Sequence, residues 1–433
     1  MPFQANPTVP PSEPPQWRRP SPEELTEALR RHAKLMDGRI GGQRAVFVLF
    51  DLRLVNLSGV DLRAAEMAGA RLDQAQLVKA RLTGANLFAA DLRLANLQQA
   101  DLSKADMRGV TMRGADLTRA RLCDADMREA VLAAYHGPQP LPASFNGRMA
   151  NLAATIAGNA DFTGSRMNGA ITLKADFSDA VMRNVDLRGG DLRGACFRGA
   201  ILEGANLQGA QLQEADFAGA MLTDAVLRDA AMEGANFKGA ILDRALMADL
   251  HKRGAITPGT GTETRSIEQI LQDHGEWIAS TGARGRRADL TGWDLSGQDL
   301  RGCNLTMARL GYCLAQRALL ADACLAMADL ECADLRDADL TNADLRGANL
   351  ERAHLMGAQL RGATLFPLIS TDMASRRWPT RLTHARLQKV DLRNADLRGA
   401  IATNADFTGA DLRGARLDGA ELEGAIFALV RHD

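Results

Sequence analysis

The chain has 433 residues and a nearly balanced charge, with 52 Lys and Arg against 53 Asp and Glu. This balance excludes a global electrostatic attraction to nucleic acid or to an anionic membrane, so we expect no direct nucleic-acid binding. The 40 glycines and the 4 % aromatic content favour tight turns and a narrow interior over a conventional core.

Localisation signals and cysteine motifs are not visible in the sequence. No apolar stretch approaches the roughly 20 residues that span a bilayer, so we expect no membrane span. The first residues lack the basic and apolar regions of a signal peptide. The six cysteines form no CxxC or CxxH pair. We therefore expect a reduced, cytoplasmic protein that holds no metal.

The N-terminal region is predicted to contain a disordered tail and a helix. Residues 1–20 are rich in proline, which predicts a disordered tail. Ser21 followed by Pro22 and Glu24 is typical of a helix start, because Ser caps the first turn and Glu closes a capping box. Residues 21–44 are therefore predicted to form an N-terminal capping helix, which Gly38 ends.

From Ala45 onward, a large apolar residue recurs at every fifth position, as in Leu97, Leu102 and Met107. A period of five fits neither the helical 3.6 nor the strand period of two. The pattern is explained if the chain turns a corner every five residues and forms a solenoid. A first run of these pentads, the first tower, is predicted at residues 45–250, with a loop at about 135–148.

The same design is predicted to begin again in the second half of the chain. Residues 251–287 combine a Gly/Thr-rich linker with a second capping helix, which starts at the capping box of Ser266 and Gln269. The second tower is predicted at residues 288–427, with a loop at about 366–380. Residues 428–433 form a short tail.

The repeated unit, Ala-(Asp/Asn)-(Leu/Phe)-X-X, resembles the signature of the pentapeptide repeat family. The resemblance implies an all-β solenoid, a right-handed quadrilateral β-helix of four pentads per coil, with short capping α-helices. In this fold the central Leu or Phe points inward and stacks on its equivalent one coil away. The small residue two positions earlier also points inward, and the other three positions face solvent.

No catalytic or cofactor-binding residue is predicted, and we expect a protein that is not an enzyme. His32 and His274 occupy matched helix positions without a ligand-like spacing, so we interpret them as structural cap residues together with Trp277. Most Asp residues directly precede a central residue, where they support a corner through backbone hydrogen bonds. Pairs of carboxylates therefore arise from the repeat itself and do not indicate catalysis.

Partner binding is the predicted function, because loops on a rigid scaffold commonly carry recognition. The loop at 366–380 holds Phe366, Arg376, Arg377 and Trp378, and Arg and Trp are frequent interface anchors. An acidic stretch of the second tower is the other candidate. Its carboxylates are Asp329, Glu331, Asp334, Asp337 and Asp339. The sequence thus predicts an interaction scaffold for an unknown protein partner.

Two alternatives follow from the resemblance. Quinolone-resistance relatives are thought to imitate duplex DNA and to engage DNA gyrase, but the nearly neutral charge of this chain disfavours such mimicry. In several relatives the C-terminal coils form a dimer interface. Phe427, Leu429 and Val430 predict such a homodimer here, because no helix follows the last pentad.

Overall fold

The computed structural model describes residues 16–242, 250, 252–257, 265–369 and 376–432. The chain divides into two compact units, residues 1–215 with 222–233 and residues 216–221 with 234–433. The interruptions of the repeat predict tower limits at 45–250 and 288–427, and these limits remain a prediction.

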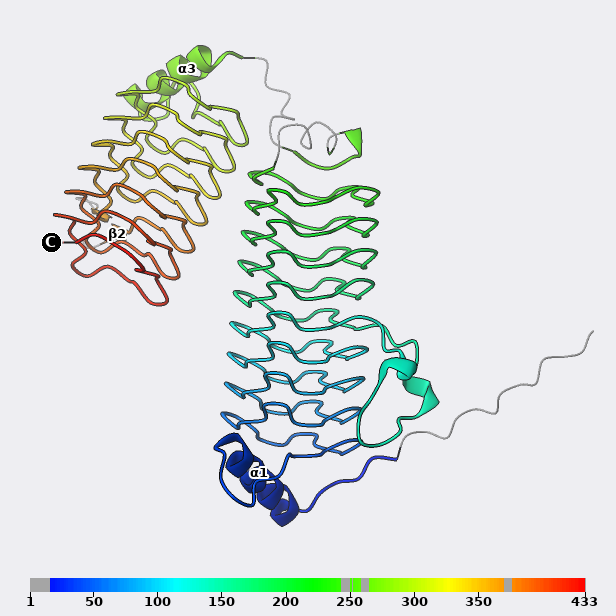
Figure 1. Ribbon diagram of the computed structural model, residues 1–433. Coiled ribbons are helices and arrows are strands. Elements are labelled where there is room, and N and C mark those ends of the chain that lie inside the picture. Colours follow the sequence, from blue (N-terminus) through cyan, green and yellow to red (C-terminus); the bar gives the residue numbers. More distant parts are fainter. Residues whose placement is uncertain (1–15, 243–249, 251, 258–264, 370–375, 433) are drawn as a thin grey trace, which may run out of the picture. The chain divides into compact units, whose positions relative to one another are not determined.

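Both units consist of stacked four-sided coils (Figure 1). Residues twenty apart pair as parallel β-bridges, from Val46 to Ala231 in the first unit. In the second unit the bridges run from Asp216 to Ile256 and from Asp289 to Arg431. A separation of twenty residues means that four pentads complete one coil, as the repeat predicted. The ladder reaches Ile256, six residues beyond the predicted end of the first tower.

The interior is filled by two residues of each pentad. The central residue and the small residue two positions earlier are both fully buried, as at Leu77 and Ala75. Aromatic central residues stack on their equivalents in the next coil, with ring centroids 5.2 Å apart for Phe177 and Phe197. The narrow, close-packed interior explains why the inward residue two positions before the central one is almost always Ala.

Corners are built by a tight turn at the end of each pentad. Ala75 N–H donates to the Leu72 carbonyl at 2.9 Å, which closes the turn. The residue before Ala75, Gln74, has a φ of 60°, and a positive φ at this place is typical of a type II turn. The Asp or Asn before each central residue accepts the N–H of the residue two positions later, as Asp51 accepts from Arg53 at 3.2 Å.

Two helices lie against coil ends. Helix α1, Pro22–Met36, is capped by Ser21 and precedes the first coil of the first unit. Helix α3, Ile267–Ala279, has a full capping box and precedes the coils that begin at Ala288 (Figure 1). A Cβ on Gly42 would lie 2.4 Å from the Leu35 backbone nitrogen, so only glycine lets the following turn approach α1 this closely.

The prediction of a disordered tail at residues 1–20 is wrong for the residues that the structure describes. Arg18 pairs with Phe50 as a parallel bridge, and Trp17 Nε1 donates to the Gly69 carbonyl at 2.8 Å. Residues 16–20 therefore lie along the side of the first coils. The rest of the predicted tail, residues 1–15, lies outside the described residues.

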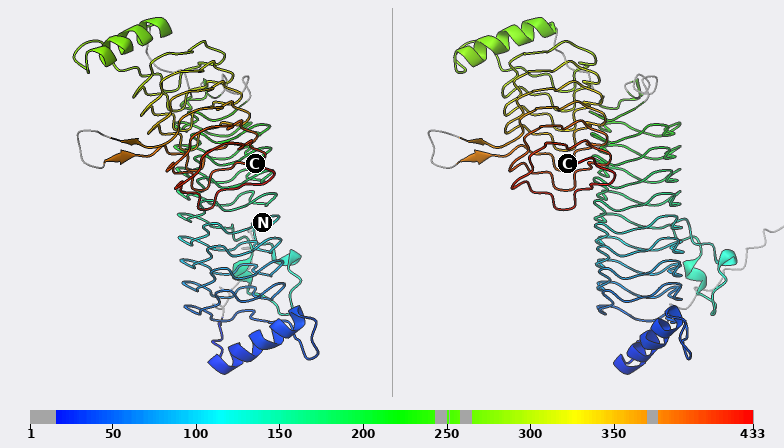
Figure 2. Two further views of the ribbon diagram at one scale, coloured as in Figure 1. Left: turned by 90° about the vertical axis from the view of Figure 1, so that its left-hand side faces the viewer. Right: turned by 60° about the vertical axis from the view of Figure 1, so that its left-hand side comes forward.

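Two insertions interrupt the coils. Thr111 pairs with Asn151, a separation of forty, so the first insertion adds twenty residues. It carries the short 3-10 helices η1, Leu132–Ala134, and η2, Ala143–Phe145. Asn349 pairs with Arg381, so the second insertion adds twelve residues. It forms a hairpin of β1, Leu368–Ile369, and β2, Arg377–Trp378, which extends from the coils of the second unit (Figure 2).

Candidate interaction surfaces

The hairpin of the second unit has an anchored stem. Phe366 lies between two guanidinium groups, 5.5 Å from Arg346 and 5.8 Å from Arg398. Thr380 is fully buried, and its hydroxyl donates to the Leu345 carbonyl at 2.9 Å. Cation–π contacts and a buried hydrogen bond therefore fix both ends of the insertion to the coils.

Beyond the stem, the hairpin exposes side chains that the coils do not use. Arg376 stacks on the Trp378 ring at 5.4 Å, and both Arg376 and Arg377 are exposed. Neither guanidinium makes an ion pair with a described residue. Ile369 pairs with Arg377 across the hairpin and is 56 % exposed. The structure thus brings the four predicted loop residues into one element, with Phe366 at its base.

The predicted acidic residues do not share one surface. Asp329, Asp334 and Asp339 belong to three consecutive pentads, and each pentad is a different side of the coil. Asp334 is fully buried, where it accepts from Arg336 at 2.7 Å and from Gln316 at 2.6 Å. Asp329 accepts from Asn349, whereas Asp337 is exposed at a corner. Glu331 is half-buried two residues after Asp329, whose carboxylate accepts its backbone N–H.

The matched histidines join each capping helix to the coil that follows it. His32 Nδ1 accepts the Ala45 N–H at 3.1 Å, and His274 Nδ1 accepts the Ala288 N–H at 3.1 Å. Both rings are fully buried, and burial lowers the pKa of each histidine below its ordinary value. Trp277 stacks on His274 with ring centroids 5.7 Å apart. This arrangement uses the imidazoles as neutral acceptors.

The C-terminal coil is open to solvent among the described residues. Phe427 stacks on Phe407 at 4.9 Å, and Val430 packs partly against the core. Leu429 is 86 % exposed. Central residues of this coil, such as Leu417 and Leu422, are only half-buried, whereas their equivalents in inner coils are fully buried.

One outward column of the first unit is buried, contrary to the expectation that three positions of each pentad face solvent. Val48, Ala68 and Phe88 are twenty residues apart, and the insertion at 131–150 covers them. Phe145 of η2 is fully buried among them, and Tyr135 packs on Phe88 at 5.1 Å. The signal was present in the sequence, because apolar residues recur at intervals of twenty in a position that is usually polar.

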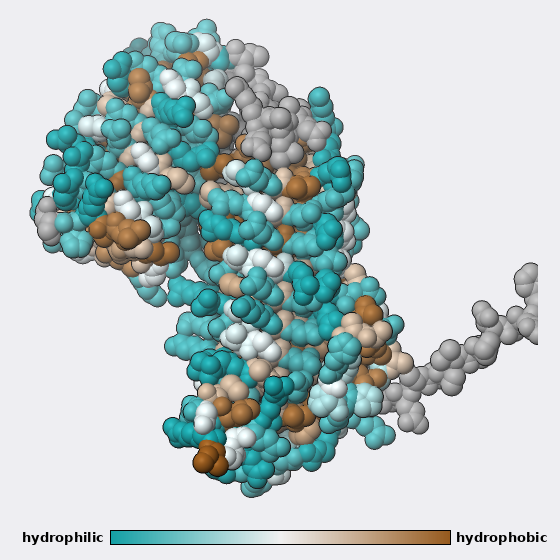
Figure 3. Space-filling view, viewed as in Figure 1, coloured by the Kyte–Doolittle hydropathy of each residue, from teal (hydrophilic) through white to brown (hydrophobic). Residues whose placement is uncertain are grey.

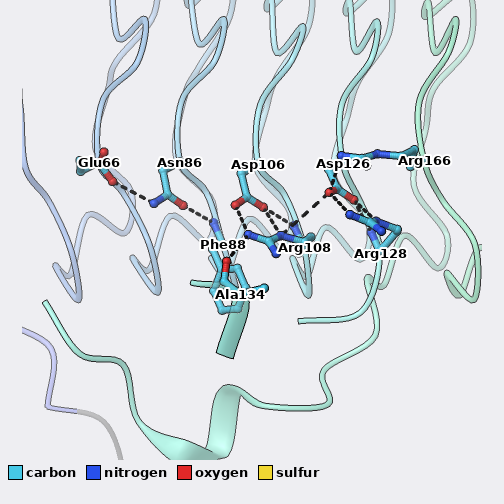
Figure 4. Close-up of polar contacts among 9 residues, drawn as sticks. All are labelled: Glu66, Asn86, Phe88, Asp106, Arg108, Asp126, Arg128, Ala134 and Arg166. Carbon is cyan, nitrogen blue, oxygen red and sulfur yellow. Dashed lines mark hydrogen bonds and ion pairs between the residues drawn. The ribbon is translucent and has the colours of Figure 1, made fainter. Parts of the chain in front are cut away.

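A polar ladder borders this cluster (Figure 4). It comprises Glu66, Asn86, Asp106 and Asp126, one from each successive coil. The Asn86 amide donates to Glu66, and Arg108 pairs with Asp106 and lies 4.0 Å from Asp126. Arg108 pairs with Asp106 at 2.6 Å and donates to the Ala134 carbonyl of η1 at 3.2 Å. Arg128 and Arg166 both pair with Asp126, whose pKa they hold below its ordinary value despite burial. The ladder attaches the insertion to the coils.

Elsewhere the outer surface is mostly hydrophilic on the face drawn in Figure 3. Many of its charges are paired within one pentad, because Arg two residues after Asp bonds both carboxylate oxygens, as Arg188 does with Asp186. Among the described residues, no group of three or more His, Cys, Asp or Glu is arranged to hold a metal ion. In the same part of the chain, no helix is long and apolar enough to cross a membrane.

Comparison with solved structures finds other pentapeptide repeat proteins. HetL of the cyanobacterium Nostoc sp. strain PCC 7120, involved in heterocyst differentiation regulation, is 21 % identical with a TM-score of 0.21, over 72 % of this chain and 87 % of HetL. The plasmid-mediated fluoroquinolone resistance protein QnrB1 is 18 % identical with a TM-score of 0.32, over 46 % of this chain and 95 % of QnrB1. A search of curated proteins gives no match.

The family profile for pentapeptide repeats matches the chain in eight copies. The matched residues are 56–93, 90–128, 160–199, 200–239, 286–311, 333–366, 380–414 and 391–428. Together they cover more than half of the chain. With the four-pentad coils described above, this match identifies the chain as a member of the pentapeptide repeat family, with its right-handed quadrilateral β-helix.

Proposed function

We propose that the protein is a non-enzymatic scaffold that binds a protein partner through the hairpin at 366–380. The observation that carries this proposal is a contrast within the hairpin. Its stem is fixed to the coils, whereas the positive charges of its two exposed arginines are not neutralised by a described residue. Phe366 and Thr380 fix the stem, whereas Arg376 and Arg377 pair with no Asp among the described residues, unlike many other arginines of the chain. An exposed Ile369 beside these cations adds an apolar contact. Such a mixture of Arg, Trp and aliphatic groups is typical of binding hot spots.

The test compares the wild-type chain with the double variant Ile369→Asp and Arg377→Glu. Tagged proteins are incubated with extract of the source cells, and co-purifying proteins are quantified by mass spectrometry. We expect a specific partner to be lost with the variant, while the thermal unfolding midpoint stays unchanged because both side chains are exposed. Arg301→Glu is the matched control, since Arg301 is an exposed arginine that is paired with Asp299.

Two results would contradict the proposal. Co-purification of the same proteins with the variant and with the wild type would remove the hairpin as the binding element. Turnover of any compound in a broad substrate panel would contradict a non-enzymatic role.

Modulation of DNA gyrase is the second candidate function. Mimicry of DNA requires an extended negative surface, and the pairing of Asp with Arg inside many pentads opposes it. A supercoiling assay distinguishes the two functions. Inhibition of supercoiling or protection from quinolones by micromolar protein would favour gyrase as the partner, and the absence of both effects would favour the scaffold.

A further inference from the structure

A second exposed surface lies on the first unit, far in sequence from the hairpin. It is a groove of about 490 Å³, and its lining includes Gln74, Leu94, Arg113, Gly114 and Ala154. Gln74, Leu94, Gly114 and Ala154 hold the same corner position in successive coils, joined by ladder hydrogen bonds. The Leu94 side chain extends over Gly114, where a Cβ would approach it to 2.8 Å. Small residues beyond Leu94 therefore leave the hollow open.

Leu54 and Leu94 place large apolar side chains at this corner position. Their φ values, 62° and 56°, are those of the left-handed backbone that the corner has throughout the repeat, as at Lys104 with 60°. Leu54 is 66 % and Leu94 is 62 % exposed, so their apolar surface is not buried within this chain. Among the described residues, the other left-handed leucines are Leu49, beside the covered cluster, and Leu429, at the open C-terminal coil. Two large apolar side chains exposed two coils apart leave apolar surface for a contact made outside the chain.

Among the arginines that line the groove or lie beside it, one has no carboxylate partner among the described residues. Arg53 and Arg93 are held by Asp51 and Asp91 within their own pentads, and Arg71 lies 3.7 Å from Asp73. Arg113 follows Thr111 instead of Asp, so its pentad lacks the carboxylate. Arg113 is exposed and makes no ion pair with a described residue. The groove thus offers one free guanidinium next to an aliphatic surface.

We propose that this groove, together with Leu54 one coil beyond it, binds an extended segment of a partner protein that presents aliphatic side chains to Leu54 and Leu94 and a carboxylate to Arg113. The column from Leu54 to Ala154 spans four coil steps, about 19 Å at the usual strand spacing, which matches roughly six extended residues. A nucleic acid fits less well, because phosphate binding uses several unpaired cations, whereas Asp73 lines the groove and Asp91 already holds Arg93. The inference rests on the proposed scaffold function and assigns it a second site with a defined partner chemistry.

The test uses fluorescence anisotropy with the labelled hexapeptide Leu-Ser-Leu-Ser-Glu-Ser. The alternation of a strand places its two leucines and its glutamate on one face. Matched probes carry Gln or Lys in place of Glu. We expect the wild-type protein to prefer the Glu peptide, and Arg113→Glu to weaken that binding about tenfold and to prefer the Lys peptide instead. Leu94→Ser should weaken all three probes.

Arg193→Glu is the control, because Arg193 is an exposed arginine of the same unit that Asp191 already holds at 2.8 Å. No measurable binding of the Glu peptide at 1 mM (on the order of the weakest specific affinities), equal binding of the Glu and Gln peptides, or unchanged binding by Arg113→Glu would each overturn the proposal. A single-stranded oligonucleotide that binds more tightly than the peptide and depends on Arg113 would overturn it in favour of a phosphate site. The hairpin variant should bind the peptide normally, so failure of this proposal and failure of the hairpin proposal give different results.

Discussion

At the scale of single residues, the pentads depend on a left-handed corner, to which many of them add a carboxylate clamp. The corner residue has a positive φ whether it is glycine or not, as at Gly84 with 66° and Lys104 with 60°. The clamp is the Asp before the central residue, whose pKa the neighbouring Arg lowers, to about 2 for Asp51 beside Arg53. Both devices act within five residues, so each substitution has a local and separable effect.

We expect Gly84→Val to destabilise the protein by about 1–2 kcal/mol, because a β-branched residue disfavours the left-handed backbone. No atom lies within 4 Å of the Cβ position at Gly84, so the effect is conformational and not steric. Urea unfolding at constant m-value measures it. Gly84→Asn should cost little. Gly158→Val, at a glycine without a positive φ, is the control, and equal destabilisation by both valines would refute the explanation.

At the scale of elements, the capping helices and the insertions protect surfaces that the repeat alone leaves uncovered. Each capping helix presents one neutral histidine to the first N–H of its coil. The insertion at 131–150 contributes Phe145 to an apolar cluster outside the coils. These contacts join segments that are separated by more than ten residues. We therefore expect a change of pH at the histidines, or truncation of Phe145, to affect the whole attached element.

We expect stability to fall as the pH decreases from 7.5 to 5, in part through His32 and His274. Burial lowers the pKa of each ring in the fold, so above the unfolded value of 6.5 both states are neutral and no stability is lost. Below it the unfolded chain takes up protons that the fold excludes, which costs on the order of 1 kcal/mol per histidine at pH 5. The charges near the rings are Asp61, Arg44 and Arg63 for His32 and Arg287 for His274.

The double variant His32→Asn and His274→Asn keeps an acceptor that does not titrate. Its free energy of unfolding, measured by urea at each pH, should depend less on pH than that of the wild type. Other histidines are common to both proteins and cancel in the difference. Identical pH profiles would show that the cap histidines do not contribute.

Phe145→Ala should release the insertion from the coils, because a fully buried phenylalanine contributes about 3–5 kcal/mol. We expect faster proteolysis and faster amide exchange within 131–150, with little change in the coils of the second unit. Ile156→Ala, at a half-exposed residue of a neighbouring coil, is the control. Unchanged exchange in the insertion would mean that the polar ladder alone holds it.

At the scale of the whole molecule, the two ends of a stack of coils are chemically different. Helices α1 and α3 each precede a first coil, whereas among the described residues no element covers the coil that ends at His432. Exposed ladder edges promote pairing with another chain. The predicted homodimer through Phe427, Leu429 and Val430 is consistent with this asymmetry and stays a prediction.

Leu429→Glu is expected to convert a dimer into a monomer at micromolar concentration, because it places charge in an apolar interface. Light scattering or sedimentation equilibrium measures the mass. Ile156→Glu, at another exposed apolar residue, should leave the mass unchanged. A monomeric wild-type protein would remove the dimer prediction altogether.

The sequence predicted the fold because its rules are local and repeated. The inward positions, the Asp-supported corners and both helix starts follow from residues within five positions of one another, and the four-sided coil agrees with them. The candidate site was less accessible to sequence reasoning. Phe366, Arg376 and Trp378 were found because they interrupt the repeat, whereas the groove at Leu94 and Arg113 lies inside an uninterrupted run and differs from its neighbours only in detail.

The sequence by itself determined the pentad, most of its buried positions and roughly where the repeat is interrupted. Only the tertiary structure decided which pentads share a side, because that depends on a spacing of twenty and on insertions of twenty and twelve residues. It separated Asp329, Asp334 and Asp339 onto different sides, buried Phe88, and packed the partly buried Trp17 against a distant segment. The physical reason is that these contacts join residues of different coils. No local preference within a pentad specifies which pentads lie on the same side or which insertion covers them.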